Sequence, residues 1–252
     1  SDGSPKLCDN YMDKIANVNY NTKSRIIVIH QQNQGAGAAR NAGIDKATGD
    51  YVVFVDSDDY IESSYFERLS QHDEDVVFID VTAVNEQGYT IRREYMSPYK
   101  HKSKDYIIRC QMTSKIPWGG VRKVVKLRLL RDNKIHYSNH KVGEEALYSF
   151  LLLLHTDSLA FIEQPLYYYV QRDTSLSHTC DTDPYGPVAL TLREVIKQMG
   201  LYNHYANTLN AFLLTAAAVS AYRLSEMNSY KEFVLKVQKQ VEWLNTETDC
   251  QY

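Results

Sequence analysis

The chain has 252 residues, enough for one large domain or for one domain with a smaller appendage. Its hydrophobic content of 44% and its charged content of 23% are ordinary for a soluble globular protein. The formal net charge of -3, without any basic tract, argues against a protein that binds nucleic acid.

The chain carries four cysteines, Cys8, Cys110, Cys180 and Cys250. Their scattered spacing predicts neither disulfides nor a zinc site, and it suits a reducing, cytoplasmic compartment. The longest apolar stretches, 150–154 and 211–221, are shorter than the about 20 residues that cross a bilayer. The polar N-terminus shows no signal peptide.

About the first two-thirds of the chain alternates between helix and strand signals. After an opening turn at 1–5, a polar, Asn-rich stretch predicts a helix and a loop. No strand precedes this turn, so we expect an N-terminal strand to be missing before it. RIIVIHQ at 25–31 predicts a strand, and the Ala-rich segment 37–47 predicts a helix. YVVFV at 51–55 is typical of a strand buried on both faces.

The alternation continues with a strand at 75–84, a hairpin turn at 85–88, a strand at 89–95, helices at 104–112, 121–131 and 144–155, and a strand at 157–171. This order implies an α/β fold with an open sheet. From residue 183 onward the pattern holds only helices, at 192–199, 207–227 and 230–244. We therefore divide the chain into an α/β domain at 1–180 and a C-terminal helical region at 181–252.

Acidic residues follow the strand at 51–55 directly: Asp56, Ser57, Asp58 and Asp59. Two carboxylates ~6 Å apart at an effective dielectric constant of ~20 repel each other by about 3 kcal/mol. Ligands of open α/β sheets bind at the carboxyl ends of strands, and hard divalent cations prefer oxygen ligands. Asp56 and Asp58 would project to the same side of an extended chain. The run predicts a cation site, and the alternative is a solvated turn or a cap of the next helix.

Residues 33–61, NQGAGAARNAGIDKATGDYVVFVDSDDYI, resemble the nucleotide-sugar-binding core of glycosyltransferase family 2. The family pattern has an Asn-x-Gly segment, an Ala-Arg-Asn-x-Gly helix, Gly-Asp-Tyr, an apolar strand and Asp-x-Asp-Asp, in this order. The likeness includes 1–4, where serine replaces the first aspartate of an Asp-Asp-Gly-Ser turn, and extends more loosely through 143–150 and 165–177. The resemblance implies an inverting enzyme with a GT-A-type, Rossmann-like mixed sheet flanked by helices.

The resemblance also implies roles for the acids. Asp58 would bind Mn²⁺ or Mg²⁺ between the two phosphates of a nucleoside-diphosphate sugar, and Asp56 would contact the ribose or share the metal. Asp2 would face the nucleotide base. Such a cation neutralises the charge that grows on the diphosphate as the anomeric C–O bond breaks. Arg40 would approach the phosphates or steady the aspartates, unless it is a surface arginine paired with Asp45 or another acid.

The general base of the family is the second acid of a Gly-Glu-Asp motif at a helix start. Here the motif reads Gly143-Glu144-Glu145. A helix dipole stabilises ionised carboxylates in the first turn, which keeps a base available and also explains purely structural acids there. We favour Glu145 over Glu144 as the base, although Glu in place of Asp adds one methylene.

Further candidates lie in two loops. Trp118, in a Pro-Trp-Gly-Gly loop, would either stack on an acceptor sugar or pack into the core. Arg172, Ser175, Ser177 and His178 follow a Tyr-rich strand, and the resemblance makes this segment a lid over the diphosphate. His178 would be a further metal ligand.

The sequence therefore predicts a metal-dependent inverting glycosyltransferase that moves a sugar from a nucleoside-diphosphate sugar, preferably a UDP-sugar, to a hydroxyl of a saccharide or glycolipid. We expect a role in cell-surface polysaccharide biosynthesis, in the cytoplasm or at the inner face of the membrane. A catalytically silent nucleotide-sugar-binding module and a sugar nucleotidyltransferase stay open as alternatives. The helical tail suits core packing, cover of the acceptor groove, self-association or contact with a membrane surface.

Overall fold

The computed structural model describes residues 3–16, 25–139, 143–172 and 185–225, together with 230–231, 234–235 and 237–238. The helices are α1 (Ser4–Ala16), α2 (Ala36–Lys46), α3 (Tyr65–Leu69), α4 (Lys104–Met112), α5 (Leu127–Asp132), α6 (Glu144–His155), α7 (Gly186–Gln198) and α8 (Tyr202–Ser225), with 3₁₀ turns η1 (Ser97–Tyr99) and η2 (Gly120–Arg122). The strands are β1 (Tyr51–Val52), β2 (Tyr60–Ile61), β3 (Val76–Val84), β4 (Thr90–Glu94), β5 (Lys123–Lys126) and β6 (Leu159–Val170).

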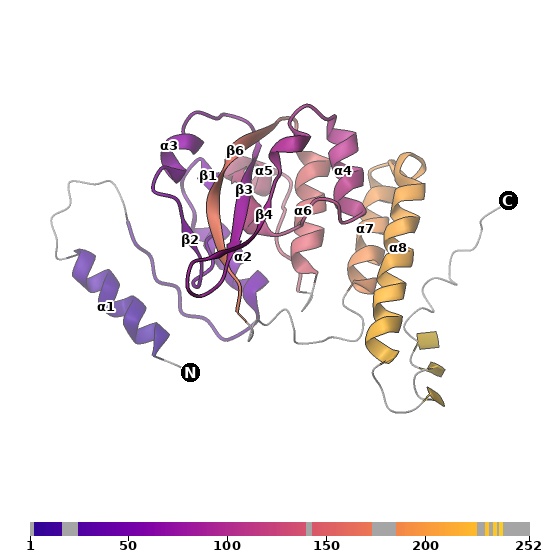
Figure 1. Ribbon diagram of the computed structural model, residues 1–252, viewed down its shortest axis with the longest axis horizontal. Coiled ribbons are helices and arrows are strands. Elements are labelled where there is room, and N and C mark those ends of the chain that lie inside the picture. The colour runs from indigo at the N-terminus through magenta and orange to yellow at the C-terminus, as the bar shows by residue number, and fades with distance from the viewer. Residues whose placement is uncertain are drawn as a thin grey trace.

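The strands form one mixed sheet in the order β1-β5-β3-β6-β2, and β4 also pairs with β3. β3 and β6 run parallel, whereas the other pairs are antiparallel. Every residue of β3 is buried, which suits a near-continuous run of apolar residues in a central strand. Figure 1 shows α4 and α6 beside the sheet and α7 and α8 as a further pair of helices beyond them. The predicted mixed sheet with flanking helices is confirmed.

The main hydrophobic core joins the sheet to these helices. Phe78 and Phe161, from the parallel strands, stack with ring centroids 5.0 Å apart. Leu192 of α7 and Phe212 of α8 are buried in the same core, and burial of such a side chain stabilises the fold by about 1.5–3 kcal/mol. The proposed boundary at 180 lies outside the described residues and stays a prediction.

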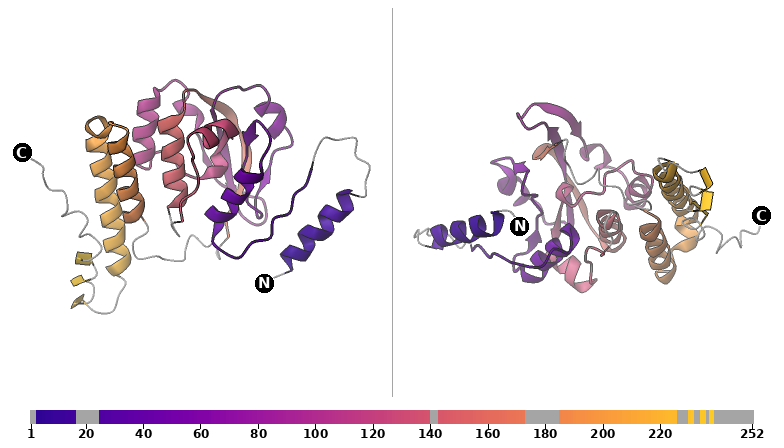
Figure 2. Two further views of the ribbon diagram at one scale, coloured as in Figure 1. Left: turned by 180° about the vertical axis from the view of Figure 1, so that it is seen from behind. Right: turned by 90° about the horizontal axis from the view of Figure 1, so that it is seen from below.

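The segment 25–31 is not the strand that its sequence predicts. It has no regular structure, and Ile26, Ile27 and Ile29 are 38%, 46% and 40% exposed. A β-branched run becomes a strand only where a neighbouring strand satisfies its backbone groups, and no described segment pairs with it. An ion pair of 2.8 Å between His30 and Asp9 connects this segment to α1, which lies at the margin of the molecule, on the side away from α7 and α8 (Figure 2).

Two other elements differ from the prediction. The strand at 51–55 is regular only at Tyr51–Val52, and Val55 is 47% exposed, because β1 pairs with β5 alone. The helix predicted at 121–131 is divided into η2, β5 and α5. The Lys-Val-Val-Lys sequence of β5 lies between β1 and β3 with all four residues buried, so pairing in the sheet overrides the helical periodicity.

Cys8 and Cys110 carry free thiols, whereas Cys180 and Cys250 lie outside the described residues. Most of the helix predicted at 230–244 is likewise outside them. Among the described helices, none is long and apolar enough to cross a membrane.

Candidate functional site

One arginine joins three of the acids that the sequence analysis singled out. The Nη2 atom of Arg40 on α2 donates a hydrogen bond of 3.0 Å to Oδ1 of Asp56. Its Nη1 atom lies 3.4 Å from Oε1 of Glu145 and 3.9 Å from Oε1 of Glu144, at the start of α6. The arginine is therefore not paired with Asp45, which contacts His136 instead. The acidic strand end and the acidic helix start meet at one place.

Asn41, the residue after Arg40, fixes the position of α2. The side chain of Asn41 accepts from the backbone N–H of Tyr137 and donates to its carbonyl, both at 2.8 Å. The guanidinium of Arg40 lies 5.3 Å from the centroid of the Tyr137 ring, which stacks on Tyr148. This contact is of the cation–π type. The Ala-Arg-Asn segment thus holds α2 against the loop that leads to α6.

Burial and neighbouring charges shift the pKa values of Arg40 and Glu144. Burial alone would lower the pKa of Arg40, but Glu145, Tyr137 and Asp56 outweigh it and raise the pKa. The pKa of Glu144 is raised by its burial and by the neighbouring charge of Glu145. Arg40 therefore stays charged, and the carboxyl of Glu144 gains a proton more readily than an ordinary glutamate does.

The acidic run after β1 forms a tight turn. The N–H of Asp59 donates to the carbonyl of Asp56 at 3.1 Å, so the two-residue spacing of an extended strand does not apply. The hydroxyl of Tyr167 on β6 accepts from the N–H of Asp56 at 3.0 Å and donates to Oδ2 of Asp59 at 2.6 Å. The N–H of Val170 also donates to Asp59. Burial raises the pKa of Asp59, against the effect of these bonds.

Asp58 lies at the tip of this turn and faces solvent. No described residue gives its side chain a hydrogen bond or an ion pair. The described residues contain no group of three or more His, Cys, Asp or Glu side chains that could hold a metal. The turn nevertheless offers two carboxylates, Asp56 and Asp58, and Mg²⁺ is often held by one or two carboxylates together with substrate phosphates. The donor set fits a cation shared with a diphosphate.

The start of α6 presents its two glutamates differently. Gly143 precedes the helix with φ 81°, a left-handed conformation that favours glycine. The side chain of Glu144 is 16% exposed, whereas that of Glu145 is 34% exposed. Oε1 of Glu145 accepts from the N–H of Gly120 at 3.3 Å. Glu145 is the better placed of the two to meet a substrate.

Two of the remaining candidates, Arg172 and Trp118, are not brought to this group. Arg172 pairs with Glu86 in the β3–β4 hairpin, with Nε and Oε1 3.6 Å apart. The indole N–H of Trp118 donates to the carbonyl of Gln111, and its ring packs edge-on against Phe150, so it belongs to the core. Asp2, Ser175, Ser177 and His178 lie outside the described residues.

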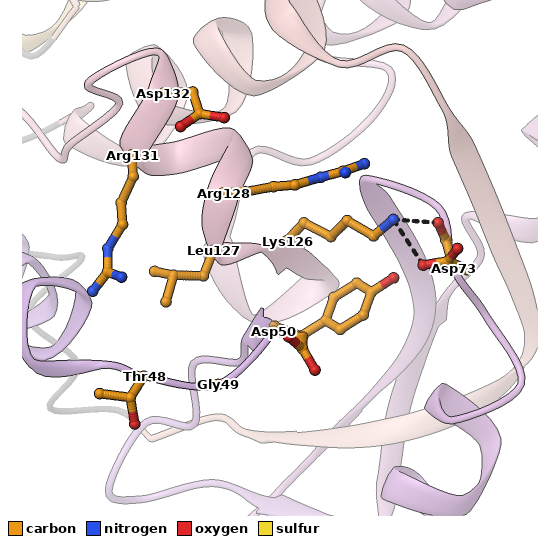
Figure 3. A pocket seen from close by; sticks show the side chains of 10 residues that line it. Thr48, Gly49, Asp50, Asp73, Lys126, Leu127, Arg128, Arg131 and Asp132 are labelled. Carbon is orange, nitrogen blue, oxygen red and sulfur yellow. Dashed lines mark hydrogen bonds and ion pairs between the residues drawn. The ribbon is translucent and has the colours of Figure 1, made fainter.

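A pocket of about 490 Å³ lies at the other end of β1, away from the acidic turn. Figure 3 shows the residues that line it, which include three basic and three acidic side chains: Lys126, Arg128, Arg131, Asp50, Asp73 and Asp132. Nζ of Lys126 lies 2.8 Å from Oδ1 of Asp73. This balance of charge does not favour a diphosphate, and none of the predicted site residues lies in the pocket.

Three residues of the site were not found from the sequence. Asn41 stands in the Ala-Arg-Asn segment and could have been singled out with Arg40. Tyr167 and Tyr137 belong to a chain with 20 tyrosines, so their contacts with the acidic turn and with α2 carry no signal in the sequence.

Comparisons with known proteins identify the family of this chain. The model of the family described as Glycosyl transferase family 2 matches residues 1–128. The protein called uncharacterized glycosyltransferase EpsJ, from Bacillus subtilis, is 27% identical over 193 residues, which are 72% of this chain and 55% of EpsJ. The poly(ribitol-phosphate) beta-N-acetylglucosaminyltransferase TarS of Staphylococcus aureus is 24% identical over 225 residues, which are 85% of this chain and 37% of TarS.

The crystal structure of S. aureus TarS 1-349 in complex with UDP-GlcNAc superposes with a TM-score of 0.61 and 22% identity, over 97% of this chain and 67% of that one. This likeness confirms the GT-A-type fold. The chain spans about half the length of the first curated relatives that it matches, 49% and 55%. Because the family model covers half of the chain, the resemblance is confirmed: the chain belongs to glycosyltransferase family 2.

Proposed function

We propose that this protein is a metal-dependent inverting glycosyltransferase that uses a nucleoside-diphosphate sugar. One observation carries the proposal: Arg40 holds Asp56 from the acidic turn and Glu145 from the start of α6 in a single group. A donor-binding carboxylate and a candidate base for the acceptor therefore lie beside the same guanidinium.

The relatives support the choice of donor and acceptor. TarS binds UDP-GlcNAc and UDP in its crystal structures, and its name gives a poly(ribitol-phosphate) acceptor. We infer that the donor is a UDP-sugar and that the acceptor group is a hydroxyl of a saccharide or glycolipid. The reaction would belong to cell-surface polysaccharide biosynthesis. We place the reaction in the cytoplasm, at the inner face of the membrane where the acceptor is lipid-linked.

The donor side of the site would hold a cation. Asp58 and Asp56 would bind Mn²⁺ or Mg²⁺, which supplies charge neutralisation for the diphosphate leaving group. A guanidinium has five N–H donors, so Arg40 can keep its bond to Asp56 and still donate to a phosphate oxygen. The tight turn fixed by Tyr167 would hold both aspartates for this task.

The acceptor side needs a base. In our proposal Glu145 removes the proton of the acceptor hydroxyl while that oxygen bonds to the anomeric carbon from the face opposite the diphosphate. The C–O bond to the diphosphate breaks, and its electron pair leaves with the diphosphate. General-base catalysis of this kind contributes about 10²–10⁴-fold.

The test measures nucleoside-diphosphate release from a panel of donors that begins with UDP-GlcNAc, with Mn²⁺, with and without saccharide acceptors. We expect acceptor-stimulated release that disappears with EDTA and in Asp58→Ala. Metal-dependent binding of a donor without release would instead identify a silent binding module. Formation of pyrophosphate from a nucleoside triphosphate and a sugar phosphate would identify a nucleotidyltransferase.

A further inference from the structure

Lys123 is a buried lysine with no assigned role. It begins β5, in the interior of the sheet, and is 1% exposed. Its Nζ donates to the carbonyls of Trp118 and Gly119 at 2.6 and 3.0 Å, and it lies 5.7 Å from the centroid of the Phe78 ring. A buried ammonium is costly unless it meets several acceptors, so its persistence calls for an explanation.

The peptide group that Lys123 contacts also contacts the candidate base. The carbonyl of Gly119 and the N–H of Gly120 belong to one planar peptide group. Lys123 binds the oxygen of this group, and Oε1 of Glu145 accepts from its N–H at 3.3 Å. The lysine and the glutamate therefore lie at the two ends of a single peptide dipole.

We propose that Lys123 is a positioning residue that holds the Gly119–Gly120 peptide against the carboxylate of Glu145. The inference rests on the proposed function in so far as Glu145 is the base. A positive charge at the carbonyl end polarises the peptide and strengthens its N–H as a donor, in the manner of cooperative hydrogen bonds. The same contact fixes the direction from which Glu145 meets an acceptor.

The packing around this peptide is close. A Cβ on Gly119 would lie 2.1 Å from Nη1 of Arg122, the end of a flexible side chain, and one on Gly120 would lie 2.3 Å from the hydroxyl of the buried Tyr137. A side chain at Gly120 would therefore displace the Tyr137 ring, whereas one at Gly119 would displace the guanidinium of Arg122. The peptide lies between the lysine and the glutamate with side chains closely packed on both of its glycines.

The charged groups that face Lys123 are Arg122 from η2 and Glu145 from α6, with Glu94 of β4 bound to Arg122. Burial and the charge of Arg122 lower the pKa of Lys123 to about 7, although Glu145 opposes them. Lys123 thus changes charge near neutral pH. Its neutral amine keeps two N–H donors, so the contact weakens above this pH without being lost.

Nuclear magnetic resonance can observe this peptide alone, because Gly119–Gly120 is the one Gly-Gly pair in the sequence. Labelling with carbonyl-¹³C glycine and ¹⁵N glycine gives one ¹³C–¹⁵N linked amide signal. We expect the signal to shift with pH around a midpoint near 7, and the shift to vanish in Lys123→Met. A signal that does not titrate, or that titrates equally in Lys123→Met, overturns the proposal.

The coupling to the base has its own measurement. Because the negative charge of Glu145 raises the pKa of Lys123, Glu145→Gln should move the midpoint of the wild-type titration to lower pH. An unchanged midpoint means that the charge of Glu145 does not reach Lys123, which contradicts the proposal. This comparison does not depend on Lys123→Met, so it holds even where that variant fails to fold.

A matched control lies on the same strand. Lys126 is also buried, but its Nζ contacts Asp73 at the opposite end of β5. Lys126→Met should leave the Gly119–Gly120 signal and its titration as in the wild type. A lost titration in this variant would show a general effect of removing a lysine from β5.

A further experiment measures transfer activity with the donor and acceptor that the wild type turns over. Lys123→Met should lower kcat by about tenfold, the loss expected when one hydrogen bond to a charged group weakens, with KM for the donor within about twofold. An equal loss of donor affinity would point to a merely structural lysine and contradict the proposal. If the wild type turns over no donor, the proposed function fails, while the resonance experiments still decide the role of Lys123.

Discussion

The acidic side chains at the two ends of the β1–β5 ladder differ in how they are paired with basic side chains. At the end with the pocket, two acids meet different cations: Asp73 pairs with Lys126 at 2.8 Å and Asp75 with Arg128 at 3.0 Å. Figure 3 shows Lys126 and Asp73 pointing toward each other. This end is electrically balanced without any ligand.

At the other end, one arginine serves several acids. Arg40 is shared by Asp56, Glu144 and Glu145, and Asp58 has no ion-pair partner among the residues that the structure describes. The surplus of negative charge is costly within the protein. This difference supports our proposal that the acids of the acidic turn meet a positively charged partner from outside, whereas the paired acids at the pocket stabilise the fold.

The largest expected effect on activity distinguishes Asp58, which has no ion-pair partner among the described residues, from Asp73, which pairs with Lys126. Asp58→Ala should lower sugar transfer by at least about 100-fold, because a lost metal ligand removes charge stabilisation in the transition state. Asp73→Ala, at the balanced end, should leave transfer within about twofold. The measurement is the rate of nucleoside-diphosphate release at saturating Mn²⁺. Similar losses in both variants would remove the distinction between the two ends.

The next effect distinguishes the two glutamates of the unbalanced end. Glu145→Gln should lower kcat by about 10²-fold or more, because an amide cannot accept the proton of the acceptor hydroxyl. Glu144→Gln should cost less than about tenfold, since the side chain of Glu144 is 16% exposed against 34% for Glu145 and is less accessible to an acceptor. The kcat of transfer at neutral pH decides between them, and the reverse order would make Glu144 the base.

The dependence of folding stability on pH distinguishes the two lysines of β5, Lys123 and Lys126. The pKa of Lys123 in the fold is about 7, below its ordinary 10.5, so the unfolded chain binds this proton more tightly. The free energy of unfolding should therefore rise with pH between about 7 and 9.5, by about 3 kcal/mol at about 1.4 kcal/mol per pH unit. Lys123→Met should lack this rise. Urea unfolding at several pH values measures it.

Lys126 should behave in the opposite way. Its hydrogen bond with Asp73 raises its pKa, so the stability that it contributes is present below pH 10.5 and is lost only above it. Lys126→Met should keep the wild-type rise between pH 7 and 9.5. A Lys126→Met curve that is flat over this range would contradict the contrast.

The smallest expected effect on activity distinguishes the hydroxyls of Tyr167 and Tyr51. Tyr167→Phe removes the two hydrogen bonds between its hydroxyl and the acidic turn and should lower kcat/KM for the donor by about tenfold, at about 1.4 kcal/mol. Tyr51→Phe, at the balanced end, removes a bond of 3.0 Å to the carbonyl of Glu74 and should leave kcat/KM unchanged. Steady-state kinetics with the donor test the pair, and equal losses would show that the hydroxyl of Tyr167 has no special role.

Much of the site could be predicted from the sequence, because it lies in short contiguous motifs. The Ala-Arg-Asn helix and the acidic run are read within 33–61, and α4 and α6 have the predicted bounds. A helix of this kind is encoded by its own apolar periodicity and by the residues at its ends.

Other features depended on contacts between distant segments. Lys-Val-Val-Lys at 123–126 has no strong local preference, and it becomes a strand because β1 and β3 offer it two edges. RIIVIHQ at 25–31 reads as a strand but is paired with no described segment. Strand formation depends on a partner, which a single stretch of sequence cannot supply.

The sequence by itself determined the family, the helices α4 and α6 and the identity of the acids. Only the tertiary structure decided that Arg40 bridges Asp56 and Glu145, that Tyr167 fixes the acidic turn, and that Lys123 and Glu145 share one peptide. The physical reason is range: propensity and periodicity act within a few residues, whereas hydrogen bonds and ion pairs act between any groups that packing brings within about 3–4 Å.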